Sequence, residues 1–263
     1  MVRAIDPTLA KHALRLDGTS AAAVNMTVGH KQHANMVDHL KRIGLKVTEL
    51  PSDGLPDSVF VEDTVVIVQD VAMITLPGAV SRRPETKRVK ETLHDLYKDS
   101  IHIVQQERGI LDGGDVLFTG HEFFVGISER TDLAGIASLQ TAFPRFKVNP
   151  IDISQIGPQH GVLHLKSACS MCGDGHVLTG GAVGMEVAKA MEMISPRRYR
   201  YSHVVDAAAS NCVYVNGHLL RRSGNEFPHS SAVLKAIGGE QIEVEASELA
   251  KVDGALTCCS VLF

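Results

Sequence analysis

The strongest constraint on the fold of this 263-residue chain is an internal repeat of strand, hairpin turn, strand, helix and strand. In the first copy, a β-branched run at 65–68 and a second run at 71–76 predict a hairpin. Residues 84–97 carry apolar side chains at helical spacing, and 101–104 predict the closing strand. The first strands of successive copies begin near residues 65, 115, 163, 211 and 256, so the pattern recurs every 45 to 50 residues.

Three further copies repeat this order. The fourth contains Asn216-Gly217, a pair that tolerates positive φ in the type I′ turn of a hairpin. The second copy has a predicted hairpin at 116–118 and 123–127, a helix at 131–143 and a strand at 147–153. The third has strands from 162 and at 176–178, a helix at 187–194 and a strand at 203–205. The fourth has a hairpin from 211, a helix at 230–237 and a strand at 241–244.

The two chain ends together predict a fifth copy. A last strand at 256–262 has no hairpin partner after it, but the N-terminal segment supplies a helix at 33–43 and a strand at 45–50. Five ββαβ units closed by pairing the ends form a ring without a bare edge strand. We therefore predict an α/β fold, a five-bladed αβ-propeller in a single domain over 1–263. A generic α/β sandwich with evenly spaced connections is the alternative.

Residues suited to catalysis occur at the same phase of each copy, at or just before its first strand: Glu62-Asp63, Asp112, His164, Asn211 and Cys258-Cys259. Equivalent positions of a ring face a common axis, so a thiol, an imidazole and carboxylates should meet at its centre. Nucleophilic catalysis by cysteine requires that combination. Taken singly each residue is weak evidence, because cysteine is often simply buried and most of the 13 histidines must be structural or on the surface.

A second cysteine pattern raises the question of a metal. His164, Cys169, Cys172 and His176 form H-x4-C-x2-C-x3-H, which offers four zinc-binding side chains. Structural zinc sites usually draw ligand pairs from two separate places, and this chain has one C-x-x-C. If 163–168 is a strand, His164 and Cys169 point to opposite faces. A dedicated zinc site is therefore the less favoured interpretation.

Composition excludes several classes of protein. The chain has 26 basic and 30 acidic residues, and its net charge of -4 argues against nucleic acid as a partner. No apolar run approaches the roughly 18 residues that span a bilayer, and the N-terminus lacks the apolar core of a signal peptide. Five cysteines, two of them adjacent, argue against a disulfide framework and favour a cytoplasmic location.

Four segments resemble the dimethylarginine dimethylaminohydrolase family, most strongly its animal-type members. They are DSVFVEDT at 57–64, LDGGDVLFTG at 111–120, HLKS at 164–167 and VDGALTCCS at 252–260. The family belongs to the pentein superfamily of guanidino-modifying enzymes, whose fold is a five-bladed αβ-propeller of ββαβ units. The resemblance, which covers nearly the whole chain, implies hydrolysis of Nω,Nω-dimethyl-L-arginine and Nω-monomethyl-L-arginine to L-citrulline and the free amine, with no cofactor.

The resemblance also implies roles for individual side chains. Cys258 matches the nucleophile, His164 the general acid and base, and Asp112 the carboxylate that orients the histidine. The implied substrate contacts are Glu62 and Asp63 on the guanidinium with Asp57 nearby, Arg82 and Arg130 on the amino-acid end, and Leu14, Val252 and Asp253. No metal is required, but zinc inhibits the family at its active-site cysteine, so the resemblance allows an inhibitory zinc at Cys258 and His164. Cys172 departs from the family pattern, which has a small apolar residue there.

These residue types suit the reaction. A guanidinium is a delocalised cation and a poor electrophile, so paired carboxylates must fix its plane and charge. A cation beside a thiol favours the thiolate. We expect Cys258 to attack the guanidinium carbon while His164 protonates the departing dimethylamine. A water activated by His164 then hydrolyses the covalent thiouronium.

Two alternatives remain open. Another guanidino-modifying pentein, such as an arginine or agmatine deiminase or an amidinotransferase, uses the same Cys–His–acid chemistry, although arginine deiminases are much longer and carry a helical insertion. The other alternative is a non-catalytic zinc-binding regulatory protein on the same fold, against which the presence of Cys258, His164 and Asp112 together argues. The resemblance further implies a role in relieving methylarginine inhibition of nitric oxide synthesis, and the oligomeric state is not predicted.

Overall fold

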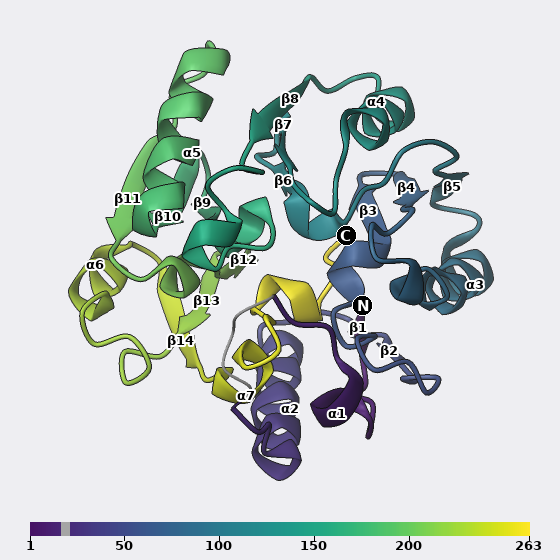
Figure 1. Cartoon of the computed structure of the whole chain (residues 1–263), viewed down its shortest axis with the longest axis horizontal. Helices are drawn as coiled ribbons and strands as arrows, with labels where there is room; N and C mark the ends of the chain where they lie inside the picture. The colour runs from purple at the N-terminus through teal and green to yellow at the C-terminus, as the bar shows by residue number, and fades with distance from the viewer. Residues whose placement is uncertain (17–21) are drawn as a thin grey trace.

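The five predicted sheets surround a common centre. The computed structural model describes residues 1–16 and 22–263. In this part of the chain, four three-stranded sheets and one two-stranded sheet are present. Viewed down the shortest axis, the long helices lie at the periphery and both chain termini lie near the centre (Figure 1). The predicted five-bladed ring of ββαβ units is therefore confirmed.

The first blade shows how each unit is built. Strands β3 (Val65–Val68) and β4 (Val71–Ile74) form an antiparallel hairpin, whose turn places Gln69 at φ 56°. Helix α3 (Glu85–Tyr97) then crosses back, so that β5 (His102–Gln105) pairs parallel to β4. A parallel partner needs a crossover of this kind, whereas a hairpin needs a tight turn.

The next three blades repeat this topology. Their elements are β6 (Val116–Phe118), β7 (Phe123–Ile127), α4 (Leu133–Ala142) and β8 (Val148–Asp152); β9 (Cys169–Gly173), β10 (His176–Gly180), α5 (Gly181–Ile194) and β11 (Arg200–Val204); and β12 (Val213–Val215), β13 (His218–Arg222), α6 (Ser231–Ala236) and β14 (Glu240–Val244). Asn216 and Gly217 both have positive φ, 52° and 77°, as the predicted type I′ turn requires.

The chain ends close the ring, but not as one long strand. Strand β1 (Val2–Arg3) pairs parallel to β2 (Glu49–Leu50), and helix α2 (Met26–Arg42) covers this blade with the short helices α1 (Leu9–His12) and α7 (Ser247–Ala250). The backbone N–H of Val261 donates to the carbonyl of Met1 at 2.9 Å. The predicted strand at 256–262 is wrong, because Thr257–Cys259 forms the 3-10 helix η7, which is followed by an isolated β-bridge between Ser260 and Val2.

A 3-10 turn precedes the first strand of each three-stranded blade. A fifth such turn carries Cys258 at the equivalent position of the two-stranded blade. These turns are η1 (Val61–Thr64), η3 (Gly113–Asp115), η5 (Leu165–Ser167), η6 (Ala207–Ser210) and η7. Neighbouring turns contact one another, η7 with η1, η1 with η3, η3 with η5 and η5 with η6. The strand predicted from 162 therefore begins later, at Cys169, because His164 is the N-cap of η5. Among the described helices, none is long and apolar enough to cross a membrane.

Candidate active site

His164 and Asp112 form a buried pair at the ring centre. Nε2 of His164 lies 2.9 Å from Oδ2 of Asp112, and Oδ1 of Asp112 accepts a hydrogen bond from the backbone N–H of Gly78 at 2.9 Å. Burial lowers the pKa of His164. The surrounding carboxylates, Asp63 first, outweigh burial and raise this pKa to about 9. His164 is therefore an imidazolium at neutral pH.

Cys258 stands on η7 and is 8% exposed. Burial raises the pKa of its thiol well above the ordinary value, and the negative charges of Glu62 and Asp63 raise it further. In the ligand-free protein the thiol is therefore protonated. A cation bound beside these carboxylates would cancel the part of the shift that they cause.

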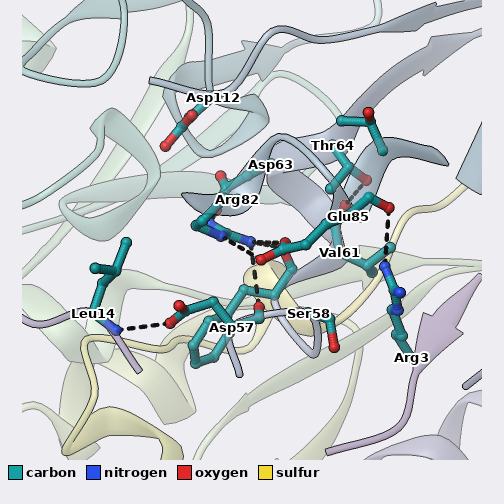
Figure 2. Close-up of polar contacts among 12 residues, drawn as sticks. Arg3, Leu14, Asp57, Ser58, Val61, Asp63, Thr64, Arg82, Glu85 and Asp112 are labelled. Atoms are coloured by element: carbon teal, nitrogen blue, oxygen red, sulfur yellow. Dashed lines mark hydrogen bonds and ion pairs between the residues drawn. The ribbon is translucent and has the colours of Figure 1, made fainter. Parts of the chain in front are cut away.

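Asp63 connects the histidine to a buried arginine. Its Oδ1 accepts the backbone N–H of Gly114 at 2.8 Å, and its Oδ2 forms an ion pair with Nη1 of Arg82. Arg82 also donates from Nη2 to Glu85 at 2.8 Å and to the carbonyl of Phe60 at 2.8 Å (Figure 2). Burial raises the pKa of Asp63, but the charges of His164 and Arg82 exceed this and lower it, so Asp63 stays ionised.

Glu62 contacts a different part of the centre. Its Oε1 forms an ion pair with Nζ of Lys166 at 2.5 Å, and its Oε2 accepts from Oγ1 of Thr257 at 2.9 Å. These three residues line a cavity of about 240 Å³ that Cys258 and His164 do not line. The predicted contact between Glu62 and the guanidinium therefore stays a prediction, while the structure gives Glu62 an ion pair of its own.

The other predicted side chains line one cavity. They are Leu14, Asp57, Asp63, Arg82, Asp112, Arg130, His164, Val252, Asp253 and Cys258. Arg15, Phe60 and Leu163 complete the lining. The cavity therefore combines a thiol and an imidazolium with several carboxylates and with arginines that come from different blades.

Two carboxylates of this cavity hold the N-terminal segment. Asp57 accepts the backbone N–H of Leu14 at 3.0 Å (Figure 2), and Asp253 accepts that of Leu16 at 2.6 Å. Burial raises the pKa of Asp57, and the charges of Arg82 and Arg130 oppose this. The segment that follows α1 is thus fixed against the cavity wall at two backbone positions.

Comparison with known proteins identifies the family. Residues 12–178, more than half of the chain, match the family model of eukaryotic N,N dimethylarginine dimethylhydrolase. The chain belongs to this family. A relative from Streptomyces coelicolor, named N(G),N(G)-dimethylarginine dimethylaminohydrolase, is 37% identical over 80% of this chain and 76% of its own length. A protein of the same name from Pseudomonas aeruginosa is 28% identical over 89% of this chain and 87% of its own length.

A solved structure agrees with the dimethylarginine dimethylaminohydrolase assignment. The Pseudomonas aeruginosa enzyme, as a mutant complexed with citrulline, matches this fold with a TM-score of 0.81 and 26% sequence identity. The match covers 98% of this chain and 96% of that chain. The resemblance inferred from the four sequence segments is thereby confirmed at the level of family and fold.

The sequence interpretation missed supporting residues within those family segments. Asp115 is fully buried, and its carboxylate accepts the backbone N–H of Leu165 at 2.9 Å and the hydroxyl of Ser128 at 2.6 Å. Burial raises the pKa of Asp115 to about 6, although the charge of His164 opposes this. Asp115 thus ties η3 to the turn that begins at His164, and its place in the DGGD segment was the available signal.

The zinc pattern is not assembled in this dimethylarginine dimethylaminohydrolase family member. Sγ of Cys172 donates to the carbonyl of His176 at 3.5 Å, while Nε2 of His176 pairs with Oγ of Ser202 at 3.0 Å. Within the described ranges, the one cluster of three potential metal ligands is Asp63, Asp112 and His164, whose ligand atoms lie within 4.8 Å of one another. The four-ligand pattern is therefore wrong as a structural zinc site, and an inhibitory zinc at Cys258 and His164 stays a prediction.

Proposed function

We propose that this protein hydrolyses Nω,Nω-dimethyl-L-arginine and Nω-monomethyl-L-arginine to L-citrulline and dimethylamine or methylamine. The observation that carries the proposal is the single cavity lined by Cys258, by the His164–Asp112 pair and by Asp63. The relatives named N(G),N(G)-dimethylarginine dimethylaminohydrolase and the citrulline complex of the Pseudomonas aeruginosa enzyme support it. The ligand is thus a small arginine derivative.

The cavity offers complementary groups to each end of such a substrate. We assign Asp63 the role of fixing the plane and charge of the guanidinium beside Cys258, and Glu62 adds negative charge near the same thiol. Asp57, which lines the same cavity and interacts electrostatically with Asp63, adds negative charge near the guanidinium. We assign Arg82 and Arg130, which line the cavity, to the amino-acid end of the substrate, and Leu14, Val252 and Asp253 to further substrate contacts.

The first half of the reaction forms a covalent intermediate. The substrate cation lowers the pKa of the Cys258 thiol, which releases its proton to solvent. The thiolate attacks the guanidinium carbon, forming a C–S bond, and the C–N bond to dimethylamine breaks. The His164 imidazolium gives its proton to the leaving nitrogen. Because Nε2 bonds to Asp112, Nδ1 is the nitrogen that remains for this transfer.

The second half restores the enzyme. His164 is now neutral and accepts a proton from water as the water oxygen bonds to the thiouronium carbon. The C–S bond breaks, the second proton of the water returns to the sulfur of Cys258, and citrulline is released. Both residues end as they began, as a thiol and an imidazolium, so no external oxidant, reductant or cofactor is needed.

The proposal also covers the domain organisation, the cellular location and the physiological role of the protein. We place the whole chain, 1–263, in one catalytic unit located in the cytoplasm, where it removes methylarginines that inhibit nitric oxide synthesis. Its five free thiols suit a reducing compartment. The net charge of -4 favours a small zwitterionic substrate over nucleic acid as its ligand.

A product assay tests the proposal. Purified protein incubated with asymmetric dimethylarginine should release citrulline and dimethylamine in equal amounts. Cys258→Ser should abolish both, whereas Cys259→Ser, which alters the adjacent buried thiol, should retain turnover. Absence of citrulline from the wild type, or unchanged turnover by Cys258→Ser, would overturn the mechanism. Faster release of citrulline and ammonia from arginine itself would favour the deiminase alternative.

A further inference from the structure

Glu85 is a buried carboxylate at the start of helix α3, and it does not line the cavity that contains Cys258. Its Oε1 accepts a hydrogen bond from Nε of Arg82 at 3.2 Å, and its Oε2 accepts one from Nη2 at 2.8 Å. Its backbone carbonyl accepts from Nη1 of Arg3, a fully buried arginine, at 3.0 Å (Figure 2). The carboxylate and the backbone of Glu85 are therefore both held in place.

Arg82 transmits this restraint to Asp63. A guanidinium is planar, so a bidentate pair with one carboxylate fixes the direction of its remaining N–H groups. Glu85 occupies the edge formed by Nε and Nη2, and Nη2 also donates to the carbonyl of Phe60 at 2.8 Å. Nη1 is left to pair with Oδ2 of Asp63. The two carboxylates thus bind different edges of the same guanidinium.

Asp63 stands between this arginine and the catalytic histidine. Its Oδ1 accepts the backbone N–H of Gly114 at 2.8 Å, and its charge makes the largest contribution that raises the pKa of His164. The other titratable groups around His164 are Asp112, Asp115 and, in the same cavity, Cys258. Buried charges of alternating sign therefore link the first strand of the chain to the histidine: Arg3, Glu85, Arg82, Asp63, His164 and Asp112.

A buried arginine needs a counter-charge, because an unpaired charge in the interior is costly. Glu85 supplies this counter-charge at the edge of Arg82 that does not face Asp63. Without Glu85, Arg82 would be free to turn and take both oxygens of Asp63. That movement would draw Oδ1 away from Gly114 and would neutralise the carboxylate that the site uses.

We propose that Glu85 is a positioning residue: it holds Arg82 to one oxygen of Asp63, so that Asp63 keeps its orientation and its negative charge for the substrate guanidinium and for His164. Glu85 touches no reacting atom and acts through Arg82. The catalytic part of this inference rests on the proposed function, whereas the effect on His164 is a property of the ligand-free protein.

Two measurements on Glu85→Gln test the inference. The pKa of His164 is read in the ligand-free protein by NMR of labelled histidine, and His164→Asn assigns its signal among the 13 histidines. Glu85→Gln removes a negative charge and leaves Asp63 to neutralise Arg82, and both changes disfavour the imidazolium. The pKa of His164 should therefore fall by roughly one pH unit. The value of kcat/KM for asymmetric dimethylarginine should fall about 10- to 100-fold, because a displaced Asp63 misplaces the guanidinium.

Two other positions on α3 provide controls. Glu91→Gln makes the same change at an exposed position and should leave both measurements at the wild-type value. Val89→Ala removes buried apolar atoms from the same helix. It should lower the thermal unfolding temperature and leave the pKa of His164 unchanged. Glu85→Asp keeps the charge but is one methylene shorter, so it should retain most of the His164 pKa and lose about tenfold in kcat/KM.

The outcomes separate this inference from the proposed function. A wild-type pKa of His164 in Glu85→Gln, or an equal fall in Val89→Ala, overturns the inference while the proposed function stands. If Glu85→Gln does not fold, Glu85→Asp decides, and wild-type kcat/KM in that variant overturns the inference equally. If the wild type produces no citrulline, the proposed function fails and the catalytic role of Glu85 with it, even where the titration of His164 responds to Glu85→Gln.

Discussion

His164 packs directly against the α-carbon of Gly114. A β-carbon at position 114 would lie 2.7 Å from Nδ1 of His164 and 2.8 Å from Oδ1 of Asp63. Both distances are shorter than real β-carbons allow, so no larger residue fits without moving the ring or the carboxylate. The glycine of the DGGD segment therefore sets the position of the nitrogen that, in our mechanism, protonates the leaving amine.

Gly114→Ala should lower kcat by about 100-fold or more, because a displacement near 1 Å at the reacting groups is costly. Overpacking of the centre should also lower the free energy of unfolding by about 1–3 kcal/mol. Gly238→Ala is the control, since a β-carbon there meets no atom within 4 Å. Steady-state kinetics and urea unfolding of both variants check the prediction, and wild-type kcat in Gly114→Ala would contradict it.

The pH profile of kcat/KM should report the titration of His164 in the free enzyme. The pKa of His164 is raised to about 9, so the imidazolium needed to protonate dimethylamine is present below pH 9 and is lost as the pH rises through 9. In Asp112→Asn the ring loses a neighbouring negative charge, and its pKa must fall. The alkaline limit of kcat/KM should move to lower pH, and kcat/KM should fall about 100-fold or more. An unchanged alkaline limit in Asp112→Asn would exclude His164 as the titrating acid.

The blades could be predicted from the local sequence, because the residues that specify each strand and each turn are adjacent in the chain. The β-branched run at 65–68, the second run at 71–76 and the pair Asn216-Gly217 specify strands and turns without help from distant residues. The end of the chain differs. Its apolar residues resemble a strand, but the side chain of Asn211 accepts the backbone N–H of Thr257 at 2.9 Å and so supports a 3-10 turn. A partner 46 residues away overrides the local preference.

Glu62 and Lys166 should behave as a buried ion pair. Removing one partner leaves the other charge buried, so Glu62→Gln and Lys166→Met should each reduce the free energy of unfolding by about 3 kcal/mol. The double variant should lose less than the sum of the two, as a double-mutant cycle in urea measures. Glu186→Gln breaks an exposed pair with Lys189 and should cost about 0.5 kcal/mol or less. Strictly additive losses would contradict the pair.

Glu122 should stabilise the contact between the second and third blades. Its buried carboxylate accepts from Asn149 at 2.7 Å, from Tyr199 at 2.8 Å and from Ser195 at 2.5 Å. Glu122→Gln places an amide donor against one of these donors and should lower the unfolding free energy by about 2 kcal/mol, with kcat unchanged. Glu240→Gln alters an exposed side chain and serves as the control. A loss of activity at full stability would contradict a purely structural role.

Most of the residues that line the candidate cavity could be predicted from the sequence, but their hydrogen-bond and ion-pair partners could not. Asp112, His164 and Cys258 lie at corresponding 3-10 turns of three different blades. All three line one cavity. The partner of a side chain depends on which neighbouring blade supplies the nearest opposite charge. For that reason the sequence did not predict the ion pair between Glu62 and Lys166.

The most direct test of the account is the mass of the protein during turnover. We predict that rapid acid quenching with asymmetric dimethylarginine yields protein heavier by one substrate less one dimethylamine, and that peptide mapping places this adduct on Cys258. Cys259→Ser should form the same adduct, and Cys258→Ser should form none. An adduct on any other residue, or citrulline production by Cys258→Ser, would contradict the central claim.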